Sequence, residues 1–494
     1  MQAHRIVIIV ILNMVLAACM LGPNFKSPPP PEIKRYTSSP LPKQTASLPT
    51  SASYGKKQHF NMGQDLPAEW WTLFHSKELN TLIDIGLDNS PTLAAAKWTL
   101  KQAQENLRAQ FGLLLMPSLS GQFAGERQRF SEESLGVNST SLFNLYNTSV
   151  NVTYPLDVFG GARRQVEAYR AQVDYQGYEM IAAYLTLTSN IATTAFTMAE
   201  LQAELKATRA LVAAEQRQLD IFKKQYKLGG IALTNILFQQ TQVDQTRALI
   251  PPLQKNLDHA RNTLAVLIGA LPSEVQLPNI DLDKLNLPKD LPLSIPSLLV
   301  KQRPDVQAAE ALLHVASAQI GVATANLFPQ FTISGAYGWE STNLHKLFNP
   351  HTNFWSYGTQ ITQSIFQGGA LLAERRAAID AYQAALAQYR QTVLLAFQNV
   401  ADSLRAVETD ARELKILRQA ELAAKKNFDL TTQQFFLGGS SYVDLLLVQQ
   451  QYQQAVINRI RSQAVRYSDT VALFQALGGG WWNTNILCEV AVTV

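Results

Sequence analysis

Cys19 is the residue whose type and surroundings predict the most definite chemistry in this sequence. Leu16-Ala17-Ala18 precedes it, after an apolar run over residues 6–16 that itself follows two basic side chains. A basic start, a short apolar run and small residues before a cysteine are typical of a lipoprotein signal peptide, and the run is shorter than the ~20 residues that a membrane-spanning helix needs. The sequence therefore predicts cleavage after residue 18, leaving Cys19 with acyl chains on its sulfur and its amine.

The other residues that usually suggest chemistry are poorly placed for it. His314 is isolated in a helical stretch, so we expect a satisfied or solvated histidine rather than a metal ligand. The run Gly478–Gly480 lacks the Lys-Ser/Thr of a phosphate-binding loop and is interpreted as a helix stop. Cys488 and Cys19 are the only two cysteines, too few for a disulfide framework or a metal cage.

The function classes that depend on catalysis, metals or nucleic acid are not favoured. We find no nucleophile elbow, zinc signature or pair of catalytic carboxylates, so we expect no enzyme activity, cofactor or bound metal. The 42 basic and 38 acidic residues give a formal net charge of +4 and form no basic run of the kind that binds nucleic acid.

The longest structural element that the sequence predicts is an uninterrupted helix, and it must position the functional residues of this chain. No proline or glycine occurs between Gly369 and Gly438, and apolar residues follow the three-four spacing of a coiled-coil seam from Ile379 onward. Two consecutive four-residue steps, one on each side of Val400, form a stutter that locally unwinds a supercoil. At ~1.5 Å per residue, such a helix would be roughly 105 Å long.

The rest of the chain contains the same plan twice, at an offset of about 210 residues. Each half has two strands, a long helix, a glycine turn and a returning helix. The expected strands are 117–130, 142–156, 329–341 and 353–366, and the expected long helices are 160–228, 232–269, 368–437 and 441–477. The expected domains are a signal peptide (1–18), an acylated extended tether (19–68), repeat 1 (69–276), a linker or side domain (277–296), repeat 2 (297–480) and a carboxyl-terminal tail (481–494).

The expected strands alternate apolar and polar residues, as in Phe331, Ile333, Tyr337 and Trp339 against the polar or small residues between them. Strands of about ten residues with this pattern fit a transmembrane barrel, although a soluble antiparallel sheet has the same alternation. Four strands cannot close a barrel, so several chains must contribute strands. Two chains would give eight strands with a filled interior, whereas three would give twelve and leave a lumen.

These features together resemble the TolC-type outer membrane factors, and specifically the lipoprotein branch that serves resistance-nodulation-division efflux pumps. The resemblance covers nearly the whole mature chain. It rests on these stretches, in order: Leu-Ala-Ala-Cys19, Gly22-Pro23-Asn24-Phe25, Trp71 to Leu82, Asp157-Val158-Phe159-Gly160, Gln302-Arg303-Pro304-Asp305, Asn326-Leu327-Phe328-Pro329 and Ala476-Leu477-Gly478-Gly479-Gly480-Trp481.

The resemblance implies a mainly α protein with membrane β structure. It implies a homotrimer whose twelve-stranded β-barrel in the outer membrane continues as a twelve-helix periplasmic α-barrel. Substrate would pass unmodified, driven by an inner-membrane pump and delivered through a periplasmic adaptor docked at the hairpin tips around Gly229, Gly230, Gly438 and Gly439. Met20, rather than Asp, follows the cysteine, which by resemblance to bacterial lipoproteins indicates the outer membrane.

The resemblance also implies a gate at the hairpin tips, where acidic side chains project into a narrow lumen. Asp444 and Asn235 occupy equivalent positions six residues after the tip glycines, and three copies of Asp444 would favour cations. Alternatively, these two residues only complement a helix dipole. The positions of a second acid and of a locking aromatic correspond to Leu447 and Phe435, either of which would form an apolar constriction.

Other functions remain open at this stage. A type I protein-secretion duct would have the same walls, because a tunnel does not reveal its cargo. A periplasmic adaptor would also be a lipoprotein with a helical hairpin, but it would carry one hairpin and not two matched halves with strand pairs.

Overall fold

The computed structural model describes residues 20–33, 35–48, 53–131 and 140–484. The chain divides into two compact units, each of which takes residues from both sequence halves. Unit 1 comprises Met1–Pro28, Thr99–Gly177 and Ala308–Arg390, and unit 2 comprises Pro29–Trp98, Tyr178–Gln307 and Gln391–Val494. The predicted signal peptide, Cys19, Cys488 and most of the predicted carboxyl-terminal tail lie outside the described residues.

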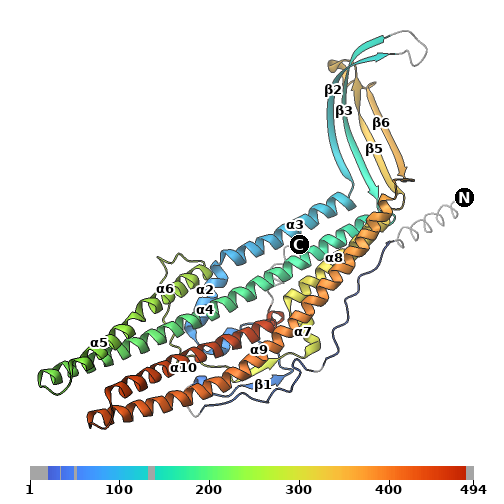
Figure 1. Ribbon diagram of the computed structural model, residues 1–494. Helices are drawn as coiled ribbons and strands as arrows, with labels where there is room; N and C mark the ends of the chain where they lie inside the picture. Colours follow the sequence, from blue (N-terminus) through green and yellow to red (C-terminus); the bar gives the residue numbers. More distant parts are fainter. Residues whose placement is uncertain (1–19, 34, 49–52, 132–139, 485–494) are drawn as a thin grey trace. The chain divides into compact units, whose positions relative to one another are not determined.

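Unit 1 contains a four-stranded antiparallel sheet in the order β2-β3-β5-β6 (Figure 1). The first half of the chain supplies β2 (Ser118–Ser131) and β3 (Thr140–Leu156), and the second half supplies β5 (Gln330–Ser341) and β6 (Asn353–Thr362). The β3–β5 ladder, from Tyr146↔Ser341 to Leu156↔Phe331, joins the two halves. The fold class expected from the sequence, two strand pairs each followed by long helices, is confirmed.

The strand register gathers the apolar residues onto one face. Gly121, Val150, Tyr337 and Trp355 lie directly opposite one another across the four strands, so their side chains share a face. Val150, Tyr337 and Trp355 are exposed in the single chain. An oily face left open to this extent needs an apolar environment, which agrees with a sheet that faces lipid.

The fourth strand ends earlier than the sequence suggested. We expected it to run to residue 366, but β6 ends at Thr362, and Ile365 and Phe366 follow it almost fully exposed. The reason is that Thr362 pairs with Gln330, the first residue of β5, so no partner strand continues beyond it.

Two helices of 67 residues each dominate the chain, α4 (Gly161–Lys227) and α9 (Ala370–Phe436). The seam predicted on α9 is buried from Tyr389 through Val400 to Leu414 and half-buried before Tyr389. The stutter at Val400 therefore lies within a continuous buried stripe. Across the described helices, no stretch combines the length and the apolarity that are required to span a bilayer.

The two returning helices differ. The helix expected over 441–477 is α10 (Tyr442–Ala476), but the one expected over 232–269 is interrupted at Leu249 into α5 (Leu233–Ala248) and α6 (Ile250–Leu267). Pro251 and Pro252 cause the break, because proline has no backbone N–H and its ring clashes with the preceding turn. The corresponding part of α10 contains no proline.

Unit 2 also contains the shorter helices α2 (Lys77–Asn89) and α7 (Pro296–Gln302), while α3 (Pro91–Leu115) and α8 (Pro304–Ala325) begin in it and continue into unit 1. Its core is aromatic. The ring centroids of Phe74 and Phe196 lie 5.2 Å apart, and those of Phe196 and Tyr467 lie 5.5 Å apart. These contacts join the short 3₁₀ helix at Trp70–Phe74 to α4 and α10, so the core is formed by segments far apart in sequence.

The second half of the segment expected as an extended tether is packed within unit 2. Strand β1 (His59–Met62) pairs in parallel with β4 (Asp290–Leu293), which lies in the stretch expected as a linker. Arg466, whose side chain is 1 % exposed, donates to the carbonyl oxygens of Tyr54 at 2.7 Å and Lys56 at 3.0 Å. A buried guanidinium needs acceptors, and this segment supplies them.

Candidate functional site

The ends of the two helical hairpins are built alike. Gly229 and Gly438 have positive φ angles of 73° and 79°, which favour glycine at a helix end. The next glycine in each case donates its N–H five residues back, Gly230 to Gln225 at 2.9 Å and Gly439 to Gln434 at 2.8 Å. The tip glycines predicted from the sequence therefore terminate both long helices in the same way.

Asp444 lies in the first turn of α10 and forms a capping box with Ser441. The Asp444 N–H donates to Ser441 Oγ at 3.1 Å, and the Ser441 N–H donates to Asp444 Oδ2 at 3.1 Å. The Ser441 hydroxyl also donates to Asp444 Oδ2 at 2.6 Å, and this bond together with that from the Ser441 N–H stabilises the charged form and holds the pKa of Asp444 below its ordinary value. Its carboxylate is fully exposed and stays ionised, as a lumen charge would have to be.

Asn235, the equivalent residue in the first half, is half-buried in the first turn of α5, a helix without a side-chain cap. Its N–H donates to the carbonyl of Ala232 at 3.1 Å. The structure thus gives the two equivalent positions the same place in their helices but different exposure, and of the two positions only the one in the second half carries a charged side chain.

The two apolar gate candidates occupy different environments. Leu447 is exposed on α10, whereas Phe435 is half-buried against Phe222 and Tyr442, with ring centroids 5.8 Å away in both cases. Phe435 belongs to a cluster around buried Phe222, Tyr442, Leu445 and Val448. Leu447 is therefore open to solvent, whereas the side chain of Phe435 is held by the packing of this cluster.

An apolar residue protrudes at each tip. Leu228 and Leu437 precede the tip glycines and are 87 % and 88 % exposed. Equivalent leucines with so little contact to their own chain are suited to contact with another chain.

A buried polar network behind the tips was not found from the sequence. Glu215 of α4 is 0 % exposed, and its Oε1 accepts hydrogen bonds from Gln449 of α10 at 2.8 Å and from Thr246 of α5 at 3.2 Å. Burial raises the pKa of Glu215 although these hydrogen bonds oppose the shift. The sequence does indicate that Glu215 is buried, because the residue occupies a core position of the helical seam that contains Leu205, Thr208, Leu219 and Phe222.

Unit 1 holds the segment that follows the predicted lipidation site. Arg164, 1 % exposed, donates to the carbonyl of Leu21 at 3.1 Å, to the carbonyl of Gly22 at 3.2 Å and to Asn24 Oδ1 at 2.8 Å. His314 is satisfied, as expected, by Glu167 Oε1 at 2.8 Å from its Nε2, and its ring stacks on that of Phe25. The chain is therefore anchored from Leu21 onward.

Two of the sequence motifs meet in unit 2. Trp481 Nε1 donates to the carbonyl of Gln302 at 2.7 Å, and Arg303 donates to the carbonyl of Ala476 at 3.0 Å. A Cβ at Gly478 would lie 2.5 Å from the Gln302 oxygen, so only glycine fits this approach. These stretches are structural partners and not parts of a binding loop.

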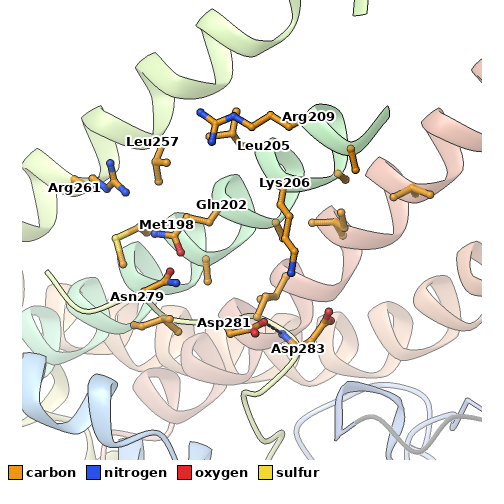
Figure 2. A pocket seen from close by; sticks show the side chains of 18 of the residues that line it. Met198, Gln202, Leu205, Lys206, Arg209, Leu257, Arg261, Asn279, Asp281 and Asp283 are labelled. Carbon is orange, nitrogen blue, oxygen red and sulfur yellow. Dashed lines mark hydrogen bonds between the residues drawn. The ribbon is translucent and has the colours of Figure 1, made fainter. Parts of the chain in front are cut away.

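A cavity of about 720 Å³ lies between α4, α6, α10 and residues 277–283 (Figure 2). Lys206, Arg209 and Arg261 line it together with Asp281, Asp283 and several apolar side chains. No histidine, cysteine or serine is among the described residues that line it. The cavity can accommodate charged groups, but it brings together none of the residues predicted from the sequence to be functional.

Two strand pairs with one apolar face, each followed by a long helical hairpin, are the features expected of an outer membrane channel. The family model described as "Outer membrane efflux protein" matches residues 82–270 and 295–479. The chain belongs to this family, and it is the outer membrane channel of an efflux system. The family is one of transport ducts.

Several known proteins are similar over nearly their whole length. The pyoverdine export outer membrane protein OpmQ of Pseudomonas aeruginosa is 27% identical over 84% of this chain and 87% of its own. The toluene efflux pump outer membrane protein TtgC of Pseudomonas putida is 27% identical over 95% of this chain and 94% of its own. The outer membrane channel CmeC of Campylobacter jejuni shares the fold, with a TM-score of 0.85 at 20% identity over 96% of this chain and 98% of its own.

Proposed function

We propose that three copies of this chain form a continuous duct, with a twelve-stranded barrel in the outer membrane and a tunnel of twelve helices in the periplasm. The observation that carries this proposal is the four-stranded sheet with an exposed apolar face. Its outer strands, β2 and β6, each pair on one side only among the described strands. An open edge is not tolerated in lipid, so neighbouring copies must supply the missing partners.

The mass of the complex extracted in mild detergent tests the stoichiometry. Native mass spectrometry should give three chains, each carrying the added mass of acyl groups at its amino terminus. A complex of two chains would leave eight strands and no lumen, and it would overturn the proposed duct. Cys19→Ala should lose the acyl mass and keep the trimer, because the barrel would hold the chain in the membrane without the lipid.

The proposed assembly delivers cargo from an inner-membrane resistance-nodulation-division pump through a periplasmic adaptor. Exposed Leu228 and Leu437 support docking of the adaptor at the hairpin tips around Gly229, Gly230, Gly438 and Gly439. The names of the relatives as efflux pump outer membrane proteins support the inner-membrane partner. No cofactor or metal is part of the proposal.

The proposed cargo is a small organic molecule such as a drug or solvent. The relatives whose names refer to pyoverdine, toluene and antibiotics support this class. A deletion strain tested for drug and dye sensitivity should become sensitive, with an unchanged set of secreted proteins. Normal tolerance together with the loss of one exported protein would instead identify a protein-secretion duct.

Within this duct, Asp444 is the proposed gate residue. Its exposed, ionised carboxylate would be repeated three times around the axis, where it would favour cations. Leu447, one turn further along α10, is the proposed apolar neighbour. Asn235 and Phe435 are the proposed supporting positions, the first by its equivalence to Asp444 and the second through the cluster at Phe222 and Tyr442.

A further inference from the structure

Glu215 is a buried carboxyl group whose hydrogen-bond partners are all neutral. Its Oε1 accepts from Gln449 Nε2 at 2.8 Å, from Thr246 Oγ1 at 3.2 Å and from Gln242 Nε2 at 3.3 Å. A buried carboxylate normally has a cation beside it, because removing the charge from water is costly. No such ion pair is formed by the described residues around Glu215, and this requires an explanation.

Two buried oxygens at this place have no hydrogen-bond donor within the described part of the chain. They are Glu215 Oε2 and Gln449 Oε1. Both belong to the two side chains that the 2.8 Å bond already joins. Buried acceptors are rarely left unpaired in native proteins, and one donor shared between these two oxygens would satisfy both.

One proton supplies the missing donor. A carboxylic acid and a primary amide are complementary, since the acid C=O accepts from the amide N–H while the acid O–H donates to the amide C=O. Placed on Glu215 Oε2, the proton would donate to Gln449 Oε1 and close a ring of two hydrogen bonds. Both unpaired oxygens would then be satisfied.

We propose that Glu215 is held as the neutral acid and, with Gln449, forms a clasp that ties α4 of the first hairpin to α10 of the second. Glu215 is a positioning residue, because it acts on the tips through the helices that it joins. Its place in the seam of α4 puts it two turns before Phe222 of the tip cluster. The link from the clasp to gating rests on the proposed function of the tips.

The surroundings of the clasp contain few charges. Gln239, Gln242 and Thr246 face it from α5, and the hydroxyl of Tyr442 on α10 donates to Gln239 Oε1. Tyr442 is the titratable neighbour, and burial together with the charge on an ionised Glu215 raises its pKa. The charged residues of this part of α5, Asp244 and Arg247, pair with each other at the surface.

The stabilisation that the clasp contributes should decrease as pH rises. The pKa of Glu215 is raised above the ordinary carboxyl value of 4.5. The stabilisation is therefore complete below that value, and it is lost as pH rises through the raised pKa. Above it, the carboxylate would face the amide oxygen of Gln449 without a proton between them, and the two hairpins would loosen.

The first measurement is the infrared difference spectrum between wild type and Glu215→Gln in the complete complex. Wild type should show an additional carboxylic acid carbonyl band at a pH above the ordinary carboxyl range, and this band should disappear as pH is raised further. Glu179→Gln, an exposed substitution on the same helix, should retain the band. Absence of the band from wild type would overturn the proposal, because a bound water and not a proton would then satisfy the oxygens.

The second measurement is the thermal midpoint across the same pH range. Wild type should lose roughly 2–8 °C on ionisation. Glu215→Gln should flatten this pH dependence, because its amide can still donate to Gln449 Oε1, whereas Glu215→Leu should be less stable at every pH. Equal pH profiles for wild type and Glu215→Gln would overturn the clasp. Neither measurement needs transport, so the clasp and the duct can fail separately.

Discussion

Ser441 and Asp444 form two reciprocal hydrogen bonds, in which the backbone N–H of each residue donates to the side chain of the other at 3.1 Å. The carboxylate that completes the capping box of α10 is also the exposed charge proposed for the channel entrance. One residue can therefore fulfil both roles, and substitutions can separate them.

Removing the charge should reduce cation selectivity. Asp444→Asn keeps a side-chain oxygen that can accept from the Ser441 N–H but removes the three charges that focus the field at the entrance. We expect reduced cation selectivity of single channels in planar bilayers. Ser441→Ala removes the cap partner and leaves the charge, so it should retain selectivity. Loss of selectivity in Ser441→Ala with full selectivity in Asp444→Asn would assign Asp444 to capping alone.

Alanine substitutions at two helical glycines of unit 1 should change the stability of the protein in opposite directions. A Cβ at Gly321 would lie 2.7 Å from Arg164 Cγ, the side chain that holds the segment at Leu21, whereas one at Gly112 would meet nothing within 4 Å. Gly321→Ala should destabilise the protein by about 1–3 kcal/mol. Gly112→Ala should stabilise it by about 0.5–1 kcal/mol, because alanine favours a helix over glycine. Thermal unfolding of the two variants checks both signs.

Removing Arg466 should free the packed part of the amino-terminal segment. The guanidinium is surrounded by neutral acceptors, and burial lowers the pKa of Arg466 to about 10. Arg466→Met leaves those acceptors unsatisfied and should cost at least about 1–3 kcal/mol. Limited proteolysis should then cut between Thr45 and Gln58, while exposed Arg412→Met should leave the segment protected.

A second acid in unit 2 should make stability depend on pH. Burial and the neighbouring carboxyl of Asp469 raise the pKa of Asp410. The stability that depends on its neutral form is present below the ordinary carboxyl range and is lost as pH rises through the raised pKa. Asp410→Asn should remove this loss, and its thermal midpoint should exceed that of wild type in alkaline solution. Exposed Asp429→Asn should follow the wild-type profile.

The exposed tip leucines should matter for transport but not for assembly. Leu228→Asp and Leu437→Asp place charges where contact with a partner is proposed, and each is nearly free of its own chain. A deletion strain that expresses either variant should recover little drug tolerance, although each variant should be isolated as a complex of normal mass. Leu271→Asp, an exposed leucine away from the tips, should restore tolerance fully.

The sequence by itself determined the repeated plan. Strict alternation in the strands, the unbroken run before Gly438 and the glycines at both tips depend on local backbone preferences and hydrophobic periodicity, which each segment carries alone. The buried stripe of α9 from Tyr389 to Leu414 was found for the same reason. Even the break at Leu249 has a local cause in two prolines, and the sequence pattern was extended across it only because the other half has none.

The tertiary structure decided what depends on partners far apart in the chain. Strand β6 ends where β5 begins, the segment around Tyr54 is packed because Arg466 needs acceptors, and Phe435 lies in a cluster rather than in solvent. Glu215 shows the difference most clearly. Its seam position was visible in the sequence, but whether a buried acid is charged depends on which atoms face it, and Gln449 comes from the other hairpin.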